Sequence, residues 1–204
     1  MPWFISGFLF FLSFVGAGDQ SMRERARLTE GGSVSNSMEY DSPVVRTPQL
    51  FEMSDLVIHG KVTGVRGVLI ENDSLVATVY TIEPYRILKQ KQSLSTSNRP
   101  GVVPSNLVVR RVGGTLIDGQ YRYSTQNSSF PETDAPKVGD EVVWFLTYRP
   151  DAGVFNFAAG AFAAFRISGD QVVAVTEEVK SRRGDVPVPL VDFLRDLDRA
   201  AGRK

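Results

Sequence analysis

Residues 137–146 have the sequence KVGDEVVWFL, which is the most informative stretch for the fold of this 204-residue chain. Val138-Gly139-Asp140 is a turn sequence, and residues 142–146 are apolar without interruption. A short, continuous run of β-branched and aromatic side chains is typical of a strand that is covered on both faces. The stretch therefore predicts the core strand of a β-structure.

Two long strands are expected before this core strand. Residues 56–65 are dense in β-branched side chains, and residues 75–88 alternate at period two. Residues 71–74, ENDS, form a turn between them, because Asn and Asp bond their own backbone and tolerate positive φ. Pro84 cannot donate a ladder hydrogen bond, so it predicts an edge, a bulge or a bend.

The remaining strands are shorter. Residues 107–112 run into the pair Gly113-Gly114, which is typical of a bulge or a close backbone crossing that lets a small sheet curl on itself. Further strands are expected over residues 154–158, 162–167 and 171–176, the last two joined by a hairpin at Gly169. The sequence thus predicts six or seven strands.

The hydrophobic period changes near the C-terminus. Four apolar residues recur at helical spacing, namely Leu190, Leu194, Leu197 and Ala201. Pro189 suits the first turn of a helix and Gly202 its end. We expect a short amphipathic helix that docks on the sheet, the alternative being a helix that lies on a membrane surface.

The N-terminus has the features of an export signal. Residues 3–15 are apolar, too short a run to span a bilayer comfortably, and they close on the small-residue pattern Val15-Gly16-Ala17. We expect a cleaved signal peptide over residues 1–17 and a secreted, periplasmic or cell-envelope protein. No Lys or Arg precedes the apolar run, so an uncleaved anchor or a misassigned start are the alternatives.

Four segments are expected along the chain. After the signal peptide, residues 18–48 are polar and lack apolar periodicity, which predicts a flexible linker in which residues 23–27 are a solvated charge run. Residues 49–178 form the β domain, and residues 179–204 form a tail that contains the short helix.

Composition excludes several classes of function. The chain has no cysteine, which excludes disulfides, thiolate metal sites and cysteine nucleophiles. Lys plus Arg and Asp plus Glu both number 23, so there is no basic surplus for binding nucleic acid. We expect a monomer with no cofactor and no metal, which contacts the membrane only if the leader stays uncleaved.

Catalysis is not the favoured function. His59 is the single histidine, and a hydrolase would need it beside an acid and an exposed serine. The sequence has no nucleophile elbow to present that serine. We therefore expect a non-enzymatic protein and keep a hydrolase that uses His59 as a remote alternative.

A binding module is the favoured class. We expect contact with an extracytoplasmic protein or peptide through two loops, residues 90–104 and 124–137. The alternative is a barrel that binds a glycan or small ligand on its curved face. The candidate ligand-binding residues for that face are Tyr121, Arg122, Tyr123 and Tyr148, which could equally be ordinary strand residues.

A family resemblance supports the predicted fold. Residues 54–62, residues 79–89, the Gly113-Gly114 pair and residues 137–146 resemble a widespread group of exported bacterial proteins of uncharacterised function. The resemblance covers about residues 49–176 and implies an OB-type barrel similar to the inhibitory domain of tissue metalloprotease inhibitors and the netrin module.

The resemblance does not extend to the mechanism of those inhibitors. They hold a catalytic zinc with an N-terminal cysteine, which this chain lacks. The predicted fold class is therefore mainly β, a small OB-like antiparallel barrel with a C-terminal amphipathic helix, and the resemblance is evidence for fold and not for activity.

Overall fold

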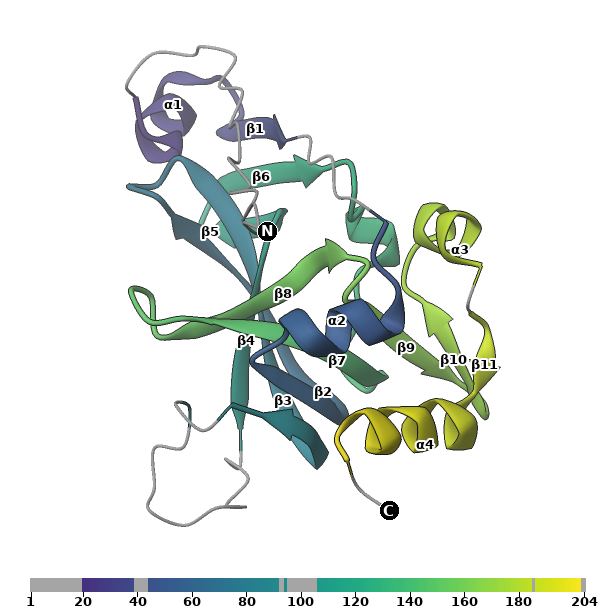
Figure 1. Cartoon of the computed structure of the whole chain (residues 1–204). Coiled ribbons are helices and arrows are strands. Elements are labelled where there is room, and N and C mark those ends of the chain that lie inside the picture. Colours follow the sequence, from purple (N-terminus) through teal and green to yellow (C-terminus); the bar gives the residue numbers. More distant parts are fainter. Residues whose placement is uncertain (1–19, 39–43, 92–93, 95–105, 185, 203–204) are drawn as a thin grey trace, which may run out of the picture.

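The computed structural model describes most of the chain as a β-rich body with helices at its periphery (Figure 1). The described residues are 20–38, 44–91, 94, 106–184 and 186–202. The predicted signal peptide over residues 1–17 and most of the predicted loop over residues 90–104 lie outside them. None of the helices in the described part is long and apolar enough to cross a membrane.

The larger sheet contains a closed circuit of strand pairings. Its members are β2 (Leu56–Ile70), β3 (Leu75–Gln90), β4 (Leu107–Val112), β7 (Glu141–Arg149) and β8 (Val154–Ala161). β7, β2, β3 and β4 pair antiparallel in that order, β4 pairs parallel with β8, and β8 pairs antiparallel with β7. The pairings therefore return to the strand from which they start.

Strand β7 is the centre of this sheet, as its sequence predicts. It pairs with β2 on one side. On the other side its first half pairs with β9 (Ala164–Ser168) and its second half with β8. Residues 142–146 are all fully buried. The sheet continues from β9 through β10 (Gln171–Ala174) to β11 (Val188–Pro189).

The turn and bulge predicted for the β2–β3 hairpin are confirmed. Glu71, Asn72 and Asp73 have φ of 53°, 54° and 64° in the turn. Pro84 lies opposite Gly60 at a register shift of the ladder. It also lies beyond the last residue of β3 that pairs with β4, so its missing N–H breaks no hydrogen bond there.

A second, three-stranded sheet crosses the far end of this hairpin. It consists of β1 (Ser33–Met38), β6 (Tyr121–Asn127) and β5 (Gly114–Asp118), with β6 in the middle and β1 parallel to it. At the crossing, a β-carbon on Gly67 would overlap the backbone of Thr115, and one on Gly114 would overlap the Thr78 hydroxyl. Gly114 thus makes a close approach, as predicted for the glycine pair, but to the Thr78 side chain, whereas the closest approach of two backbones is at Gly67, which was not predicted.

The structure differs from the flexible linker predicted over residues 18–48. Helix α1 (Met22–Leu28) and strand β1 occupy much of that range. Their few apolar side chains form a small core of their own with residues from β3 and β6, namely Met22, Ala26, Val34, Val76 and Tyr123. These contacts offset the entropy lost when a polar segment becomes ordered. They depend on residues far along the chain, so the local sequence alone does not reveal them.

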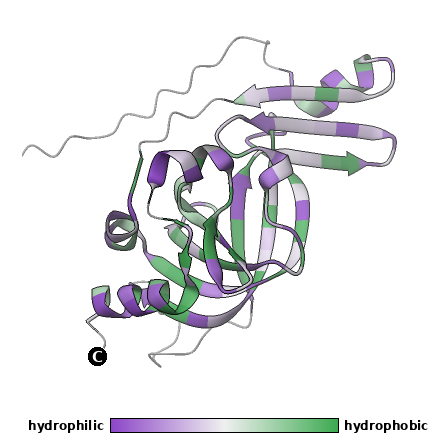
Figure 2. Ribbon diagram, turned by 90° about the vertical axis from the view of Figure 1, so that its right-hand side faces the viewer, coloured by the Kyte–Doolittle hydropathy of each residue, from purple (hydrophilic) through white to green (hydrophobic). Residues whose placement is uncertain are grey.

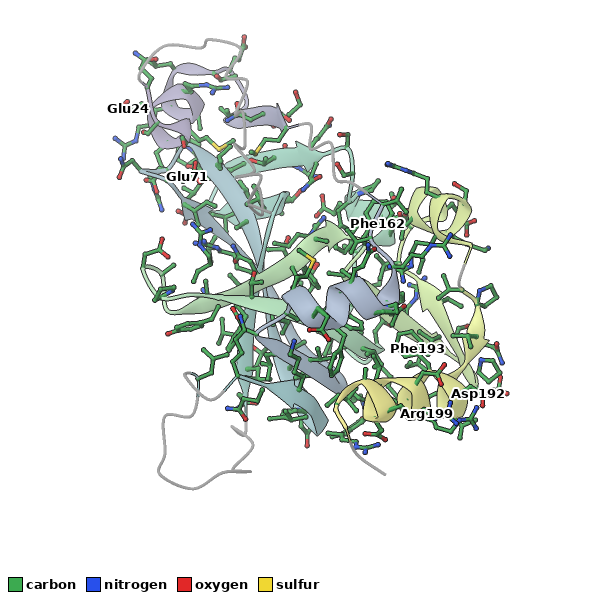
Figure 3. The ribbon with its side chains drawn as sticks, in the orientation of Figure 1. Glu24, Glu71, Phe162, Asp192, Phe193 and Arg199 are labelled. Carbon is green, nitrogen blue, oxygen red and sulfur yellow. The ribbon has the colours of Figure 1, made fainter. Side chains whose placement is uncertain are left out.

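Three helices surround the larger sheet: α2 (Thr47–Met53), α3 (Glu177–Arg183) and α4 (Leu190–Ala200). The predicted C-terminal helix is confirmed as α4, which docks through Phe193 and Leu197. The Phe193 ring lies 5.3 Å from that of Phe165, and Figure 3 shows Asp192 and Arg199 on the same helix. Helix α3 and strand β11 were not predicted, and the predicted tail is therefore more ordered than expected.

Arg183 of α3 joins two distant parts of the chain. Its buried guanidinium donates hydrogen bonds to the carbonyl oxygens of Val45 at 2.6 Å and Phe162 at 3.1 Å, and to the Thr47 hydroxyl at 2.7 Å. It also lies 4.8 Å from the centre of the Phe165 ring. The segment that leads into α2 is thus tied to the sheet by one side chain.

The predicted fold class holds in its general form. The protein is mainly β with a C-terminal helix, and apolar residues concentrate in the larger sheet (Figure 2). The described residues contain eleven strands, where six or seven were predicted. Two pairings, β1–β6 and β4–β8, are parallel and so depart from a purely antiparallel sheet.

Candidate functional site

A cleft of about 340 Å³ lies between helix α1 and the turn that joins β5 to β6. We call it the α1–β6 cleft, and its lining residues are Arg23, Arg27, Asp118, Gly119, Gln120, Tyr121 and Tyr123. Figure 3 marks this end of the molecule by Glu24 on α1 and Glu71 on the β2–β3 turn.

Helix α1 is fixed in place by its cap and by two apolar side chains. The Ser21 hydroxyl accepts a hydrogen bond from the Glu24 N–H at 3.3 Å, and the Glu24 carboxylate accepts one from the Ser21 N–H at 3.2 Å. Met22 and Ala26 are buried one turn apart. Arg23 and Arg27, each following one of them, therefore share a second side of the helix and line the cleft.

Arg23 is held by two carboxylates, one in the β2–β3 turn and one at the end of β5. Its Nε lies 2.7 Å from Asp73 Oδ2, and its Nη1 lies 3.0 Å from Asp118 Oδ2. The hydrogen bond to Asp73, and then that to Asp118, raise the pKa of Arg23 above its ordinary value. Because all three side chains are well exposed, these ion pairs position α1 more than they stabilise the fold.

The other polar groups of the cleft have no such partners. Among the described residues, none forms a hydrogen bond or ion pair with the Arg27 guanidinium, the Gln120 amide or the hydroxyls of Tyr121 and Tyr123. Tyr123 is only 2% exposed. Its hydroxyl is not among the fully buried polar atoms that lack a partner, so the oxygen reaches solvent at the cleft although the ring is buried. The cleft therefore presents donors that the protein itself does not use.

The predicted ligand-binding residues are divided between two sheets. Tyr121 and Tyr123 meet at the α1–β6 cleft, with ring centroids 6.4 Å apart. Arg122 lies between them on β6 but is exposed and does not line the cleft, because successive strand residues face opposite sides. Tyr148 belongs to β7 in the larger sheet, where its ring packs 5.1 Å from that of Phe155.

Five lining residues were not predicted from the sequence: Arg23, Arg27, Asp118, Gly119 and Gln120. The two arginines were interpreted as part of a solvated charge run. The pattern Ser21-x-x-Glu24 is a capping box that could have indicated a helix there. Asp118 has no local signal, since it meets Arg23 across 95 positions of sequence.

His59 occupies a different place on β2. Its Nε2 lies 2.6 Å from Glu141 Oε1, and its ring meets that of Tyr85 edge-on at 5.6 Å. Among the described residues no serine hydroxyl is hydrogen-bonded to His59. Within that same part of the chain, no three His, Asp or Glu side chains lie close enough to hold a metal ion.

The predicted loop over residues 124–137 is structured at its start and middle. Strand β6 extends to Asn127, and a short 3-10 turn covers Glu132–Asp134. Phe130 of this loop is buried, with the Arg111 guanidinium 4.8 Å from the centre of its ring. Part of this loop is therefore core and not a free contact surface.

The sequence matches no protein-family model, and no curated protein matches it significantly. The chemistry of the site is therefore inferred from its geometry alone. The α1–β6 cleft combines cationic, amide and phenolic donors and contains no serine, threonine, cysteine or histidine in its lining. Such a set is equipped to bind a ligand by hydrogen bonds and charge.

Proposed function

We propose that this chain is a non-catalytic, extracytoplasmic binding module that contacts a protein or peptide partner through the α1–β6 cleft. The observation that carries the proposal is the set of donors in this cleft, on Arg27, Gln120, Tyr121 and Tyr123, which no described residue satisfies. A side chain or chain end of a partner that entered the cleft would accept hydrogen bonds from them.

The proposed scaffold is an OB-type barrel. Its support is the circuit of five strands, β7, β2, β3, β4 and β8, since OB-type barrels have five strands that close or nearly close on themselves. The cleft lies on the added three-stranded sheet and not on the larger one. In this proposal the barrel is a rigid support, and the small sheet with α1 supplies the binding surface.

The proposed location outside the cytoplasm rests on the sequence. The apolar run over residues 3–15 with its small-residue ending supports export, and the balanced charge disfavours a nucleic-acid partner. We propose a monomer in the secreted, periplasmic or cell-envelope fraction.

Site-directed photo-crosslinking in the native cell envelope tests the proposal. A benzophenone amino acid replaces exposed Gln120 in the cleft, and a control chain carries it at Val191, which is 70% exposed on α4. We expect a discrete adduct from position 120 only. The adduct should be lost when Tyr121→Ala is added and kept with Tyr148→Ala. Equal adducts from both positions, or none, would contradict the proposal.

A small ligand is the second candidate, favoured by the volume of the cleft. About 340 Å³ falls in the range of small-molecule sites, which begins near 300 Å³. A flat glycan platform is less favoured, because Tyr123 is too buried to offer a ring face and the Tyr121 and Tyr123 rings are inclined at 39°. Thermal-shift screening would identify such a ligand, and a shift that Tyr121→Ala leaves unchanged would remove this site.

A further inference from the structure

We infer that the α1–β6 cleft binds a singly charged carboxylate, with Arg27 as the cation that holds it. This inference rests on the proposed binding function and names the ligand chemistry of the same site. Its basis is the contrast between the two arginines of the cleft: Arg23 is engaged by Asp73 and Asp118, whereas Arg27 has no acidic partner among the described residues.

Arg27 is the one cation of the cleft lining that pairs with no carboxylate among the described residues. The lining contains two arginines and Asp118, but Arg23 is also paired with Asp73, so these two arginines and two aspartates together carry no net charge. A carboxylate ligand would pair with Arg27, because Arg23 is already engaged. A phosphate, with about −1.5 to −2 charges, would add a surplus of negative charge beside Asp118.

The hydrogen-bonding groups point to the same chemistry. A carboxylate only accepts hydrogen bonds, and its two oxygens offer about four lone-pair positions. The unpartnered lining groups can all donate: the Arg27 guanidinium as a planar fork, the two tyrosine hydroxyls and the Gln120 amide. A cationic ligand would find only one carboxylate in the lining, that of Asp118, which already accepts a hydrogen bond from Arg23.

The volume limits the ligand to a small group. A cleft of about 340 Å³ holds one acidic side chain, one chain terminus or one free small acid. On one flank, Gly119 leaves open space within 4 Å of where a β-carbon would stand. A carboxylate attached to a longer chain therefore has an exit there.

Titration calorimetry of the purified full chain with four probes tests the inference. N-acetyl-glutamate amide carries only a side-chain carboxylate, and N-acetyl-glutamine carries only a terminal one. N-acetyl-glutamine amide is their neutral counterpart, and inorganic phosphate is the dianionic comparison. We expect at least one carboxylate probe to bind about tenfold or more tightly than the neutral probe and than phosphate. If the side-chain carboxylate probe binds more tightly, the natural ligand is an acidic side chain. If the terminal carboxylate probe binds more tightly, the natural ligand is a chain end.

Two charge-removing variants locate the effect. Arg27→Gln should weaken carboxylate binding about tenfold or more and abolish the preference over the neutral probe. Arg122→Gln is the matched control, because it removes the same charge from β6 between the two tyrosines but outside the cleft. It should change the affinity less than about twofold. Both arginines are exposed, and a thermal melt of each variant verifies folding.

Three results would overturn the inference. They are carboxylate probes that bind no tighter than the neutral one, equal losses from the two variants, and no binding by any probe at millimolar concentration. If the position-120 crosslink still forms in any of these cases, the proposed binding function survives and only the carboxylate chemistry is wrong. Carboxylate binding without a crosslinked partner would instead overturn the protein-partner proposal and leave this inference intact.

Discussion

Replacing Gly67 by alanine should destabilise the protein by pushing the two sheets apart. A β-carbon at this position would overlap the Thr115 carbonyl oxygen and would lie 3.0 Å from the Thr115 carbonyl carbon and 3.1 Å from Leu116 Cα. All three atoms belong to the backbone of β5, which cannot rotate away as a side chain can. The Gly67 φ does not lie in the left-handed region, so the expected effect is steric alone.

The size of the effect follows from two opposing contributions. Ordinary van der Waals contact begins near 3.4 Å, so β5 would have to withdraw by about 1 Å. Overpacking of this kind costs about 1–3 kcal/mol, and the loss of unfolded-chain entropy returns about 0.4–1 kcal/mol. We expect a net loss of about 1–2 kcal/mol in the free energy of unfolding.

Gly64→Ala in the same strand is the matched control. Its β-carbon would meet only the Thr81 side chain, at 3.3 Å and 3.4 Å, and we expect a change within about 0.5 kcal/mol. Urea denaturation followed by tryptophan fluorescence measures both variants. With a slope of about 2 kcal/mol per molar urea, Gly67→Ala should lower the midpoint by about 0.5–1 M. Equal midpoints for the two variants would refute the steric argument.

Three further changes test the packing and electrostatics of the larger sheet. Phe193→Ala should cost about 3–5 kcal/mol because the ring packs in the core, whereas Val191→Ala on the exposed side of α4 should cost less than about 0.5 kcal/mol, both measured by urea denaturation. Arg183→Met should lower the free energy of unfolding by about 3 kcal/mol or more, because it leaves the buried carbonyl oxygens of Val45 and Phe162 without a donor. A loss under about 1 kcal/mol would show that water replaces the guanidinium. Asp55→Asn tests pH dependence. Burial raises the Asp55 pKa, but the ion pair with Lys91 and the hydrogen bond from a backbone N–H together lower it by more, so the Asp55 pKa lies below its ordinary value. The charged form therefore stabilises the folded state above about pH 4, and this stabilisation is lost as the pH falls through the lowered pKa, so the variant should be less stable at pH 7 and its deficit should shrink as the pH is lowered below about 4. An undiminished deficit at pH 3 would contradict it.

The larger sheet was predictable because its signals are local. Alternation in β3, the continuous apolar run in β7 and the turn residues of the β2–β3 hairpin each lie within a few residues of the structure they specify. The parallel pairing of β4 with β8 has no such signal, since it depends on how the sheet curls in three dimensions.

Helix α1 and strand β1 were missed for the opposite reason. Met22, Ala26 and Val34 are isolated apolar residues in a polar segment, and their burial depends on Val76 and Tyr123, which lie far along the chain. Composition therefore favours a linker, although the capping box of α1 was visible in the sequence.

The candidate site was predictable only in part. The alternation of β6 predicts that Tyr121 and Tyr123 lie on one face of the strand, and both do line the α1–β6 cleft. It could not assign Tyr148 to a different sheet, because a period of two says nothing about which strands are neighbours. Arg27 was not predicted at all, because its role depends on a helix that the composition argued against.

The parallel pairing of β1 with β6 also has a consequence for the order of folding. When β1 is synthesised, its partner β6 does not yet exist, because the two strands are separated by the whole β2–β3 hairpin and by β4 and β5. The first described segment of the chain therefore cannot take up its native pairing until residue 127 has been made. During synthesis this N-terminal segment has to wait without its sheet partner while the long hairpin that follows it is completed.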